Sequence, residues 1–271
     1  MIRRFILAFN KLVFCYTISA DLSSFISLVC NTKKRKWHSK KNSVNLPDKL
    51  IKYNFRINGQ RRQVFLRTYA GDISIFYELF LYKAYKLPGT IHATATHIVD
   101  AGAHVGLASL FFLSLSPGAK LFSIEPDAEN FSILQKNLKN VIELGKVIPV
   151  HAAIDNKDGF LGVTRSQFGY NTKMNDSQEG EKIVAISLNS LVTLHEINII
   201  DIIKIDVEGY ERKIFSENVE WLDLVKNIIL ETHSSEDYDV CTSVLLGKGF
   251  QIKKLISLNN DAQNIYLASK T

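Results

Sequence analysis

The sequence predicts an α/β fold, in which helices cover both faces of a mostly parallel sheet. From residue 97 onward, apolar runs of strand length alternate with segments of helical periodicity. Such alternation produces right-handed crossovers between parallel strands. The last two expected strands follow each other without a helix, which predicts one antiparallel edge. With 46% hydrophobic and 22% charged residues, the composition excludes a disordered, collagen-like or multi-span membrane chain.

The charge is divided unevenly between a basic front and an acidic body. Residues 1–67 hold 15 Lys/Arg and 2 Asp/Glu, a net charge of +13, whereas residues 68–271 sum to −7. Because the basic excess belongs to one segment, it does not predict that the whole surface binds nucleic acid.

Residues 1–52 are expected to form a basic, partly helical extension. Two apolar segments, 5–16 and 22–30, precede a run of basic residues from Lys33 to Lys41. This pattern suits helices packed on the body with a solvated basic loop. The second-ranked interpretation is an interfacial helix with a polybasic patch, which would place the chain in peripheral contact with an anionic membrane.

Neither a membrane span nor a signal peptide is expected at this end. Lys11 and Asp21 interrupt the apolar stretch, and no small-x-small cleavage site follows it. The three cysteines, Cys15, Cys30 and Cys241, form no CxxC pair, which favours a reducing compartment. We therefore expect a cytoplasmic location, peripheral at a membrane surface if the basic segment binds lipid.

Residues 53–96 are expected to lead into the core domain, residues 97–271. Alternating residues on both sides of Asn58-Gly59 predict a hairpin over 53–67. Apolar spacing predicts a helix over 73–85 that ends before Pro88-Gly89.

The core elements follow from the same periodicities. We expect strands at 97–101, 120–124, 147–154, 183–187, 202–207, 228–232, 251–256 and 264–268. We expect helices at 106–115, 128–140, 188–196, 210–215 and 237–248. A polar break covers 155–182, and within it residues 168–171 are a candidate lid or acceptor wall.

The turn after the first core strand is a candidate ligand site. A dinucleotide fingerprint needs glycine where His104 and Leu107 stand, so that class of ligand is excluded. Asp100 at the strand end suits a ligand that carries an ammonium and a sulfonium, as S-adenosyl-L-methionine (SAM) does. Gly102 and Gly106 would allow close approach of the backbone.

A second acidic residue ends the next strand. Glu125, followed by Pro126, is placed to accept both hydroxyls of an adenosine ribose. The alternative is that Asp100 and Glu125 are two exposed acidic turn residues.

Five segments resemble the FkbM family of SAM-dependent methyltransferases: Val99–Gly106, Ser123–Pro126, His151–Ile154, Ile200–Glu211 and Ile229–His233. A weaker similarity covers residues 68–78, and the basic N-terminus is not covered. The family more often has Asn at the position of His104.

The resemblance implies a Rossmann-like class I methyltransferase fold with a seven-stranded sheet, mostly parallel with one antiparallel strand. It also implies O-methylation of a hydroxyl on a glycan or small natural product, with SAM as cofactor. By position, Asp100, Gly102, Ala103 and Gly106 would surround the methionine part of SAM. Glu125 and Pro126 would hold the ribose. Ala153 and Ile154 would border the adenine, and Asp155 would serve its amino group or simply form a turn.

Candidates for handling the acceptor proton follow the next two core strands: Asp206 and Glu208, then Glu231 and His233. Alternate residues of a strand share a face, so Glu231 and His233 are expected to point the same way. His233 is the preferred base because imidazole titrates near neutral pH. Asp206 or Glu231 would orient it or steer the acceptor.

Two other interpretations of this cluster stay open. The carboxylates satisfy buried backbone groups and His233 caps the strand, or two carboxylates and the histidine bind a divalent cation. The metal interpretation ranks below the metal-free base, so no metal is expected.

Two alternatives to a small-molecule or glycan O-methyltransferase belong to other functional classes. Nucleic-acid methylation of amino groups commonly uses an N/D/S-P-P-Y/F/W block, where this chain has residues 206–209 as Asp-Val-Glu-Gly. An acidic pocket mouth would also repel phosphates, so no nucleic-acid partner is expected. A non-catalytic SAM-binding module that meets a membrane or a partner through residues 1–52 is the other alternative.

Overall fold

The computed structural model describes residues 2–41, 48–165, 172–175, 181–255 and 264–270. The chain divides into two compact units, residues 1–82 and 83–271, each described here by itself. The boundaries expected at residues 52 and 96 stay predictions. The candidate lid at residues 168–171 lies outside the described residues.

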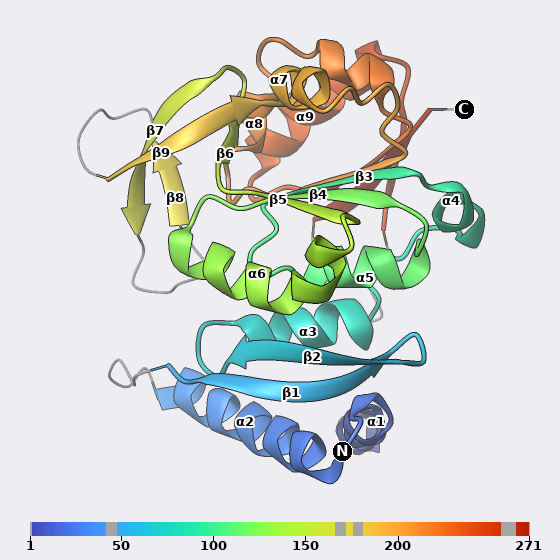
Figure 1. Ribbon diagram of the computed structural model, residues 1–271, viewed down its shortest axis with the longest axis vertical. Helices are drawn as coiled ribbons and strands as arrows, with labels where there is room; N and C mark the ends of the chain where they lie inside the picture. Colours follow the sequence, from blue (N-terminus) through green and yellow to red (C-terminus); the bar gives the residue numbers. More distant parts are fainter. Residues whose placement is uncertain (1, 42–47, 166–171, 176–180, 256–263, 271) are drawn as a thin grey trace. The chain divides into compact units, whose positions relative to one another are not determined.

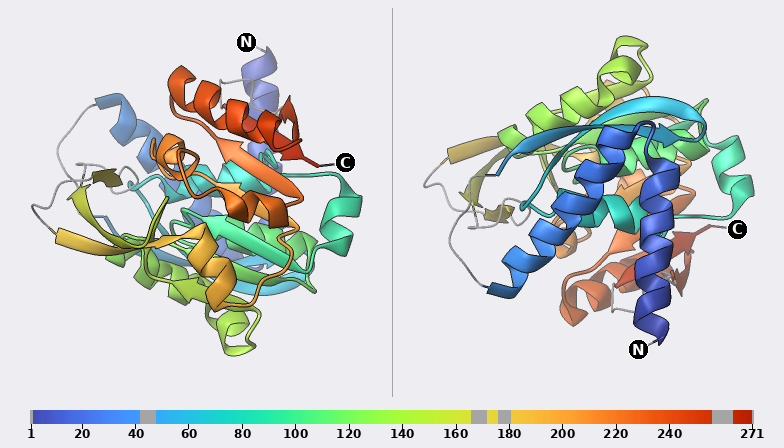
Figure 2. Two further views of the ribbon diagram at one scale, coloured as in Figure 1. Left: turned by 90° about the horizontal axis from the view of Figure 1, so that it is seen from above. Right: turned by 90° about the horizontal axis from the view of Figure 1, so that it is seen from below.

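The first unit is a hairpin with three helices. Its elements are α1 (Ile2–Ile18), α2 (Leu22–Lys41), β1 (Leu50–Ile57), β2 (Gln60–Arg67) and α3 (Asp72–Phe80). The predicted hairpin is confirmed, since Ile57 pairs with Gln60 and the two residues between them, Asn58 and Gly59, have positive φ. Figure 2 (right) shows α1 and α2 lying across the hairpin.

Aromatic side chains form the core of this unit. Phe55 of β1 stacks on Phe76 of α3 with ring centroids 4.4 Å apart, and Asn31 of α2 donates to the Tyr53 hydroxyl at 2.8 Å. The three helices therefore meet one face of the hairpin. The predicted helix 73–85 is too long: α3 ends at Phe80, and Lys83 takes a left-handed φ of 55° that no helix accommodates.

The basic segment of residues 33–41 is helical, because α2 extends to Lys41. The expectation that this segment is a loop is therefore wrong. No helix among the described residues is long and apolar enough to cross a bilayer.

The second unit contains the predicted seven-stranded sheet. Its strands are β3 (His97–Ala101), β4 (Lys120–Ile124), β5 (Val147–Val150), β10 (Ile202–Ile205), β11 (Asn227–Glu231), β12 (Gln251–Lys254) and β13 (Ile265–Ser269). They lie in the order β12-β13-β11-β10-β3-β4-β5. β13 is antiparallel to both neighbours, and the other pairs are parallel. The predicted seven-stranded, mostly parallel sheet with one antiparallel strand is thus confirmed. The antiparallel strand was expected at the edge, but β13 lies between β11 and the edge strand β12.

Helices cover both faces of this sheet, as expected (Figure 1). α5 (Leu107–Leu115) and α6 (Ala128–Glu143) lie on one face; α7 (Leu188–Leu194), α8 (Glu211–Ile214) and α9 (Ser235–Gly247) lie on the other. Two short helices were not predicted, α4 (Gly89–Thr94) and the 3₁₀ turn η1 (Glu220–Leu224).

A second, four-stranded sheet corrects three expectations. It joins β6 (Ala153–Asp155), β9 (Glu181–Ser187), β7 (Gly159–Arg165) and β8 (Thr172–Asn175) in that order. The single strand expected at 147–154 is two strands in different sheets. The strand expected at 183–187 leaves the main sheet, and the polar break contains β7 and β8. Pro149 lies in β5, the edge strand of the main sheet, where a residue without an N–H is tolerated.

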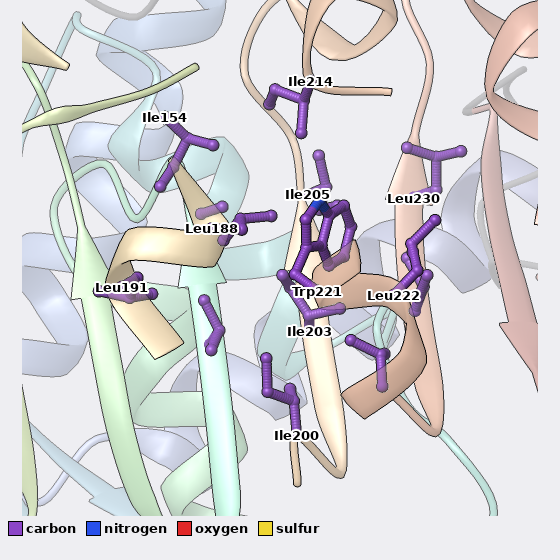
Figure 3. Close-up of a cluster of buried hydrophobic side chains, with 14 of the residues drawn as sticks. Ile154, Leu188, Leu191, Ile200, Ile203, Ile205, Ile214, Trp221, Leu222 and Leu230 are labelled. Atoms are coloured by element: carbon purple, nitrogen blue, oxygen red, sulfur yellow. The ribbon is translucent and has the colours of Figure 1, made fainter. Parts of the chain in front are cut away.

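A large hydrophobic cluster lies on the α7–α9 face of the main sheet (Figure 3). Ile203 and Ile205 of β10 point into it beside Trp221 of η1. Because side chains alternate along a strand, Lys204 between them faces the other side. That side carries the charged groups of the site.

Candidate functional site

The turn after β3 is held by backbone contacts that only glycine permits. Gly102 has φ 77°, and a Cβ on it would overlap the carbonyl oxygen of Asp206. Gly106 begins α5 with φ 79°, and a Cβ there would press on Leu134 and Leu138 of α6. The ends of β3 and β10 are therefore in direct contact at this turn.

Glu125 joins this turn to the start of α6. Its Oε2 accepts from the backbone N–H of His104 at 2.8 Å, and its Oε1 accepts from the N–H of Asp127 at 2.9 Å and the Asn130 amide at 3.3 Å. The side chain is 5% exposed. Burial raises the pKa of Glu125 to about 7, although these N–H donors oppose the shift. The next residue, Pro126, places its carbonyl oxygen 3.0 Å from His151 Nε2.

Asp100 faces the protein interior. Ser109 donates to its Oδ2 at 2.6 Å, and its Oδ1 lies 3.5 Å from Lys204 Nζ. Since neither Asp100 nor Glu125 is exposed, the alternative of two exposed acidic turn residues is wrong.

Lys204 is a buried cation that the sequence analysis missed. It lies opposite Asp100 in the β3–β10 register, and its ammonium donates to the Gly102 carbonyl at 2.6 Å. It also pairs with Asp206 Oδ2 at 3.2 Å. Burial lowers the pKa of Lys204, but Asp206, Asp100 and Glu231 together raise it above its ordinary value. Lys204 therefore stays charged and links the turn after β3 to the residues after β10.

Tyr85 is a second residue that the sequence analysis did not find. Its hydroxyl donates to Glu231 Oε2 at 2.9 Å and lies 3.3 Å from Asp206 Oδ2. The structure thus brings Asp206 and Glu231 together through Tyr85.

His233 follows the end of β11 and joins the same group. Its Nε2 lies 3.8 Å from Asp206 Oδ1 and 3.6 Å from Glu208 Oε2, and its side chain is 30% exposed. Its Nδ1 lies 3.0 Å from Glu211 Oε1. We call Asp206, Glu208, Glu211, Glu231 and His233 the strand-end cluster.

Glu211 connects the loop after β10 to His233 through hydrogen bonds. It is fully buried, and its Oε1 accepts from the N–H groups of Val207 and Gly209 at 3.1 and 3.3 Å. Its Oε2 is buried without a hydrogen-bond partner among the described residues. The sequence analysis placed Glu211 in a motif only, because nothing local shows that its side chain returns beneath the loop.

The protonation of His233 differs from the expectation of a near-neutral imidazole. The bond to Glu211 raises its pKa most, burial opposes this, and Asp206 and Glu208 add to the rise; the resulting pKa is about 9. His233 therefore carries a proton through the neutral range.

Asp206, Glu211 and His233 also meet the geometric requirement of a metal site. One ligand atom from each lies within 4.8 Å of the others. Two carboxylates and an imidazole suit a divalent cation. The hydrogen bonds and ion pairs above satisfy most of the same atoms without one.

The residues expected near adenine lie on β6. Ala153 packs against Leu161 and Ala185 of the small sheet, whereas Ile154 belongs to the large hydrophobic cluster. Asp155 is buried, and its Oδ1 accepts from the N–H of Asn156. Ala153, Ile154 and Asp155 thus belong to the four-stranded sheet, whereas the strand-end cluster lies at the ends of β10 and β11 in the seven-stranded sheet.

The sequence profile of the methyltransferase FkbM domain matches residues 100–263, more than half of the chain. The hexuronic acid methyltransferase AglP of Haloferax volcanii is 27% identical over 163 residues; the match covers 60% of this chain and 66% of that protein, just under two thirds of its length. Methyltransferase 1 of Beauveria bassiana is 24% identical, with 65% of this chain and 79% of that protein covered.

A solved structure also resembles this chain. The crystal structure of methyltransferase FkbM from Methylobacillus flagellatus has a TM-score of 0.48 and 16% sequence identity. The comparison covers 98% of this chain and 59% of that one.

Proposed function

The chain belongs to the FkbM methyltransferase family, and from this we propose that it transfers the methyl group of SAM to a hydroxyl on a glycan or small natural product. Methyl transfer and the cofactor follow from the family. The contact between the turn after β3 and the residues after β10 carries the rest of the proposal, because it sets a donor site beside groups that handle protons.

The residues of the turn fit SAM. Gly102 and Gly106 fix the path of the turn, because the space that their side chains would occupy is taken by the Asp206 carbonyl and by α6. Glu125 uses three of the roughly four acceptor positions of a carboxylate, which leaves one for a ribose hydroxyl. When bound, SAM supplies a methyl group on a sulfonium that needs no further activation. Ala103, Pro126, Ala153 and Ile154 complete the proposed cofactor site, and Asp100 acts on it through the turn.

The buried pair of Asp100 and Lys204 supports the turn from behind. Lys204 donates to the carbonyl of Gly102 and lies 3.4 Å from that of Ala101. Asp100 helps to hold this ammonium in place. We assign to the pair the positioning of the turn, with the charge of Lys204 shared between Asp100 and Asp206.

His233 is proposed as the base that takes the acceptor proton at Nε2, with Asp206 and Glu231 orienting the acceptor hydroxyl. Since the pKa of His233 is about 9, about one molecule in a hundred has the basic form at pH 7. Turnover should therefore rise toward alkaline pH. Alignment of the two substrates is the other contribution that a methyltransferase site makes.

The charge of the strand-end cluster favours an uncharged acceptor. Asp206, Glu208 and Glu231 lie together with the cations Lys204 and His233 among them. A carboxylate or phosphate on the acceptor would be repelled. AglP is named for a hexuronic acid, whereas we propose a neutral hydroxyl for this chain.

Transfer of labelled methyl groups from SAM tests this function. We expect label in neutral glycan or polyketide-like hydroxyl compounds, as an ether that resists alkali. Label released by mild alkali would indicate a carboxylate acceptor, and label in RNA or DNA would favour the nucleic-acid alternative. A chelator that abolishes transfer, with recovery on adding a divalent ion, would favour the metal interpretation over the base.

We also propose peripheral contact with an anionic membrane through the basic segment of residues 33–41. Lys33, Lys34 and Lys36 are exposed on α2, and each lysine near an anionic surface contributes about 1 kcal/mol of binding.

A further inference from the structure

Helix α1 turns an apolar face away from its own unit. Six large apolar side chains along it are between 44% and 70% exposed: Ile6, Leu7, Phe9, Leu12, Val13 and Tyr16. Isolated apolar residues on a surface are ordinary, but a contiguous group of this kind marks an interaction site.

Five of these six residues share one side of the helix, and Leu7 lies nearer the packed side, four positions before Lys11. Phe9, Val13 and Tyr16 follow at intervals of four and three, which stacks them on one face. The opposite face is the one that packs, since Cys15 is buried and Lys11 lies over the Tyr77 ring of α3. Packing within the unit therefore leaves the more apolar face of α1 without a partner among the described residues.

Helix α2 also has an exposed face, which is apolar in its first half and basic and aromatic in its second half. In its first half Leu22 and Ile26 are exposed, and in its second half Lys33 and Trp37 follow at the same helical position. α1 and α2 both contact β1, and Figure 2 (right) shows them meeting at the turn that joins them and diverging away from it. We call their exposed faces together the α1–α2 face.

Acidic side chains are almost absent from this surface. Asp21 is the single acidic residue within positions 1–47, and it is engaged by the Ser24 N–H, the Asn54 amide and Arg61. An apolar stripe that ends in lysines and a tryptophan, with no free carboxylate, complements the headgroup boundary of an anionic bilayer.

We propose that α1 lies in the interface of an anionic membrane, with Phe9, Val13 and Tyr16 inserted at the headgroup boundary. Lys33 and Lys36 of α2 bind the phosphates beside it. This inference rests on the membrane contact proposed above and adds the surface that enters the bilayer.

Vesicle sedimentation with the full-length chain tests the insertion. The probes are phosphatidylcholine vesicles with and without phosphatidylglycerol. We expect the wild-type protein to sediment with the anionic vesicles, and the double variant Phe9→Ser/Val13→Ser to bind them at least tenfold more weakly. Leu144→Ser, at a leucine outside the surface that is 70% exposed, should bind like the wild type.

A second pair of variants isolates the electrostatic part. Lys33→Gln/Lys36→Gln should lower affinity for anionic vesicles by roughly thirty-fold, because each lysine contributes about 1 kcal/mol. Lys136→Gln, at an exposed lysine of α6, is its control. Trp37 emission should shift to the blue on binding, and the shift should be absent in Trp37→Phe.

The outcomes separate the two proposals. If Phe9→Ser/Val13→Ser binds like the wild type while the lysine variant is weakened, the contact is electrostatic and insertion is wrong. If neither pair changes binding, both proposals fail. If light scattering shows a wild-type dimer that Phe9→Ser/Val13→Ser converts to a monomer, a second copy covers the face and the membrane proposal is overturned. Circular dichroism of each variant checks that the helices remain.

Discussion

At the scale of single residues, the proton on His233 depends on Glu211. The buried carboxylate accepts from the imidazole and is the largest cause of its raised pKa. Because the folded pKa lies above the ordinary value, the pair stabilises the fold below about pH 6.5 and loses this contribution as pH rises through about 9.

We predict that Glu211→Gln lowers the pKa of His233 toward 6.5, since it removes the charge and the main hydrogen-bond acceptor. NMR titration should show this shift, with His233→Gln identifying the resonance. The pH profile of turnover should move to lower pH in parallel. An unchanged profile, together with a shifted titration, would remove His233 from the role of base.

His233→Ala should lower turnover by roughly 10² to 10⁴, the usual contribution of a positioned base, and leave SAM affinity nearly unchanged. Alkaline pH should partly rescue the variant, because more acceptor then ionises unaided. Calorimetry with SAM is the control. Normal turnover of His233→Ala at every pH would show that the residue only ends the strand.

The raised pKa of Glu125 gives SAM binding a pH dependence. Its carboxylate form accepts hydroxyl hydrogens, and protonation near pH 7 removes an acceptor. SAM affinity should therefore fall as pH drops below about 7. Glu125→Gln should weaken binding about tenfold at high pH and abolish the pH dependence. Calorimetry that finds the same pH dependence in the variant would contradict the assignment.

These residues also show how far the sequence predicts the site. Glu125 and His233 were found because each follows a strand of clear pattern at the edge where ligands bind. Lys204 and Tyr85 were missed because Lys204 contacts Gly102, 102 positions away in the chain, and Tyr85 contacts Glu231, 146 positions away. Only the register of β3 on β10 reveals that Lys204 faces Asp100.

At the scale of elements, the contact of the β3 turn with β10 depends on one glycine. We predict that Gly102→Ala destabilises the fold by more than about 1 kcal/mol and abolishes measurable SAM binding, because the methyl group overlaps backbone and φ is positive. Gly118→Ala, where a Cβ meets nothing within 4 Å, is the matched control. Thermal unfolding and calorimetry give both readouts, and equal behaviour of the two variants would contradict this account.

The sequence predicted the main sheet better than the small one for a physical reason. The central main strands are buried on both faces and contain continuous apolar runs, such as Ile228–Leu230 in β11. β7 and β8 are rich in glycine and polar residues, and β6 has three residues. Short strands of this kind acquire their pairing from neighbours that a local pattern does not contain.

At the scale of the whole molecule, each unit buries its own aromatic core, around Phe76 in residues 1–82 and around Trp221 in residues 83–271. A ligand that binds one native unit stabilises that unit by mass action. SAM at about one hundred times its Kd should add about 2.7 kcal/mol to the unit that holds the turn.

Calorimetric unfolding should therefore show two responses. SAM should raise the transition of residues 83–271, followed by Trp221 fluorescence in a Trp37→Phe background. Phe76→Ala, which removes a fully buried ring, should lower the other transition by the equivalent of about 3 to 5 kcal/mol. A single transition that both changes move would show that the units unfold as one.

The lack of space between Gly102 and the Asp206 carbonyl has a consequence for how relatives of this enzyme diverge. An insertion or deletion in the loop after β10 would displace the turn after β3, where the methyl donor is proposed to bind. The loop must therefore keep its path and length. New acceptors are then accommodated by exchanging the side chain of Glu208, which is partly exposed and holds no backbone group among the described residues. Libraries that vary acceptor preference should therefore keep the backbone of residues 206–209 and vary position 208 among residues that tolerate its φ of 55°.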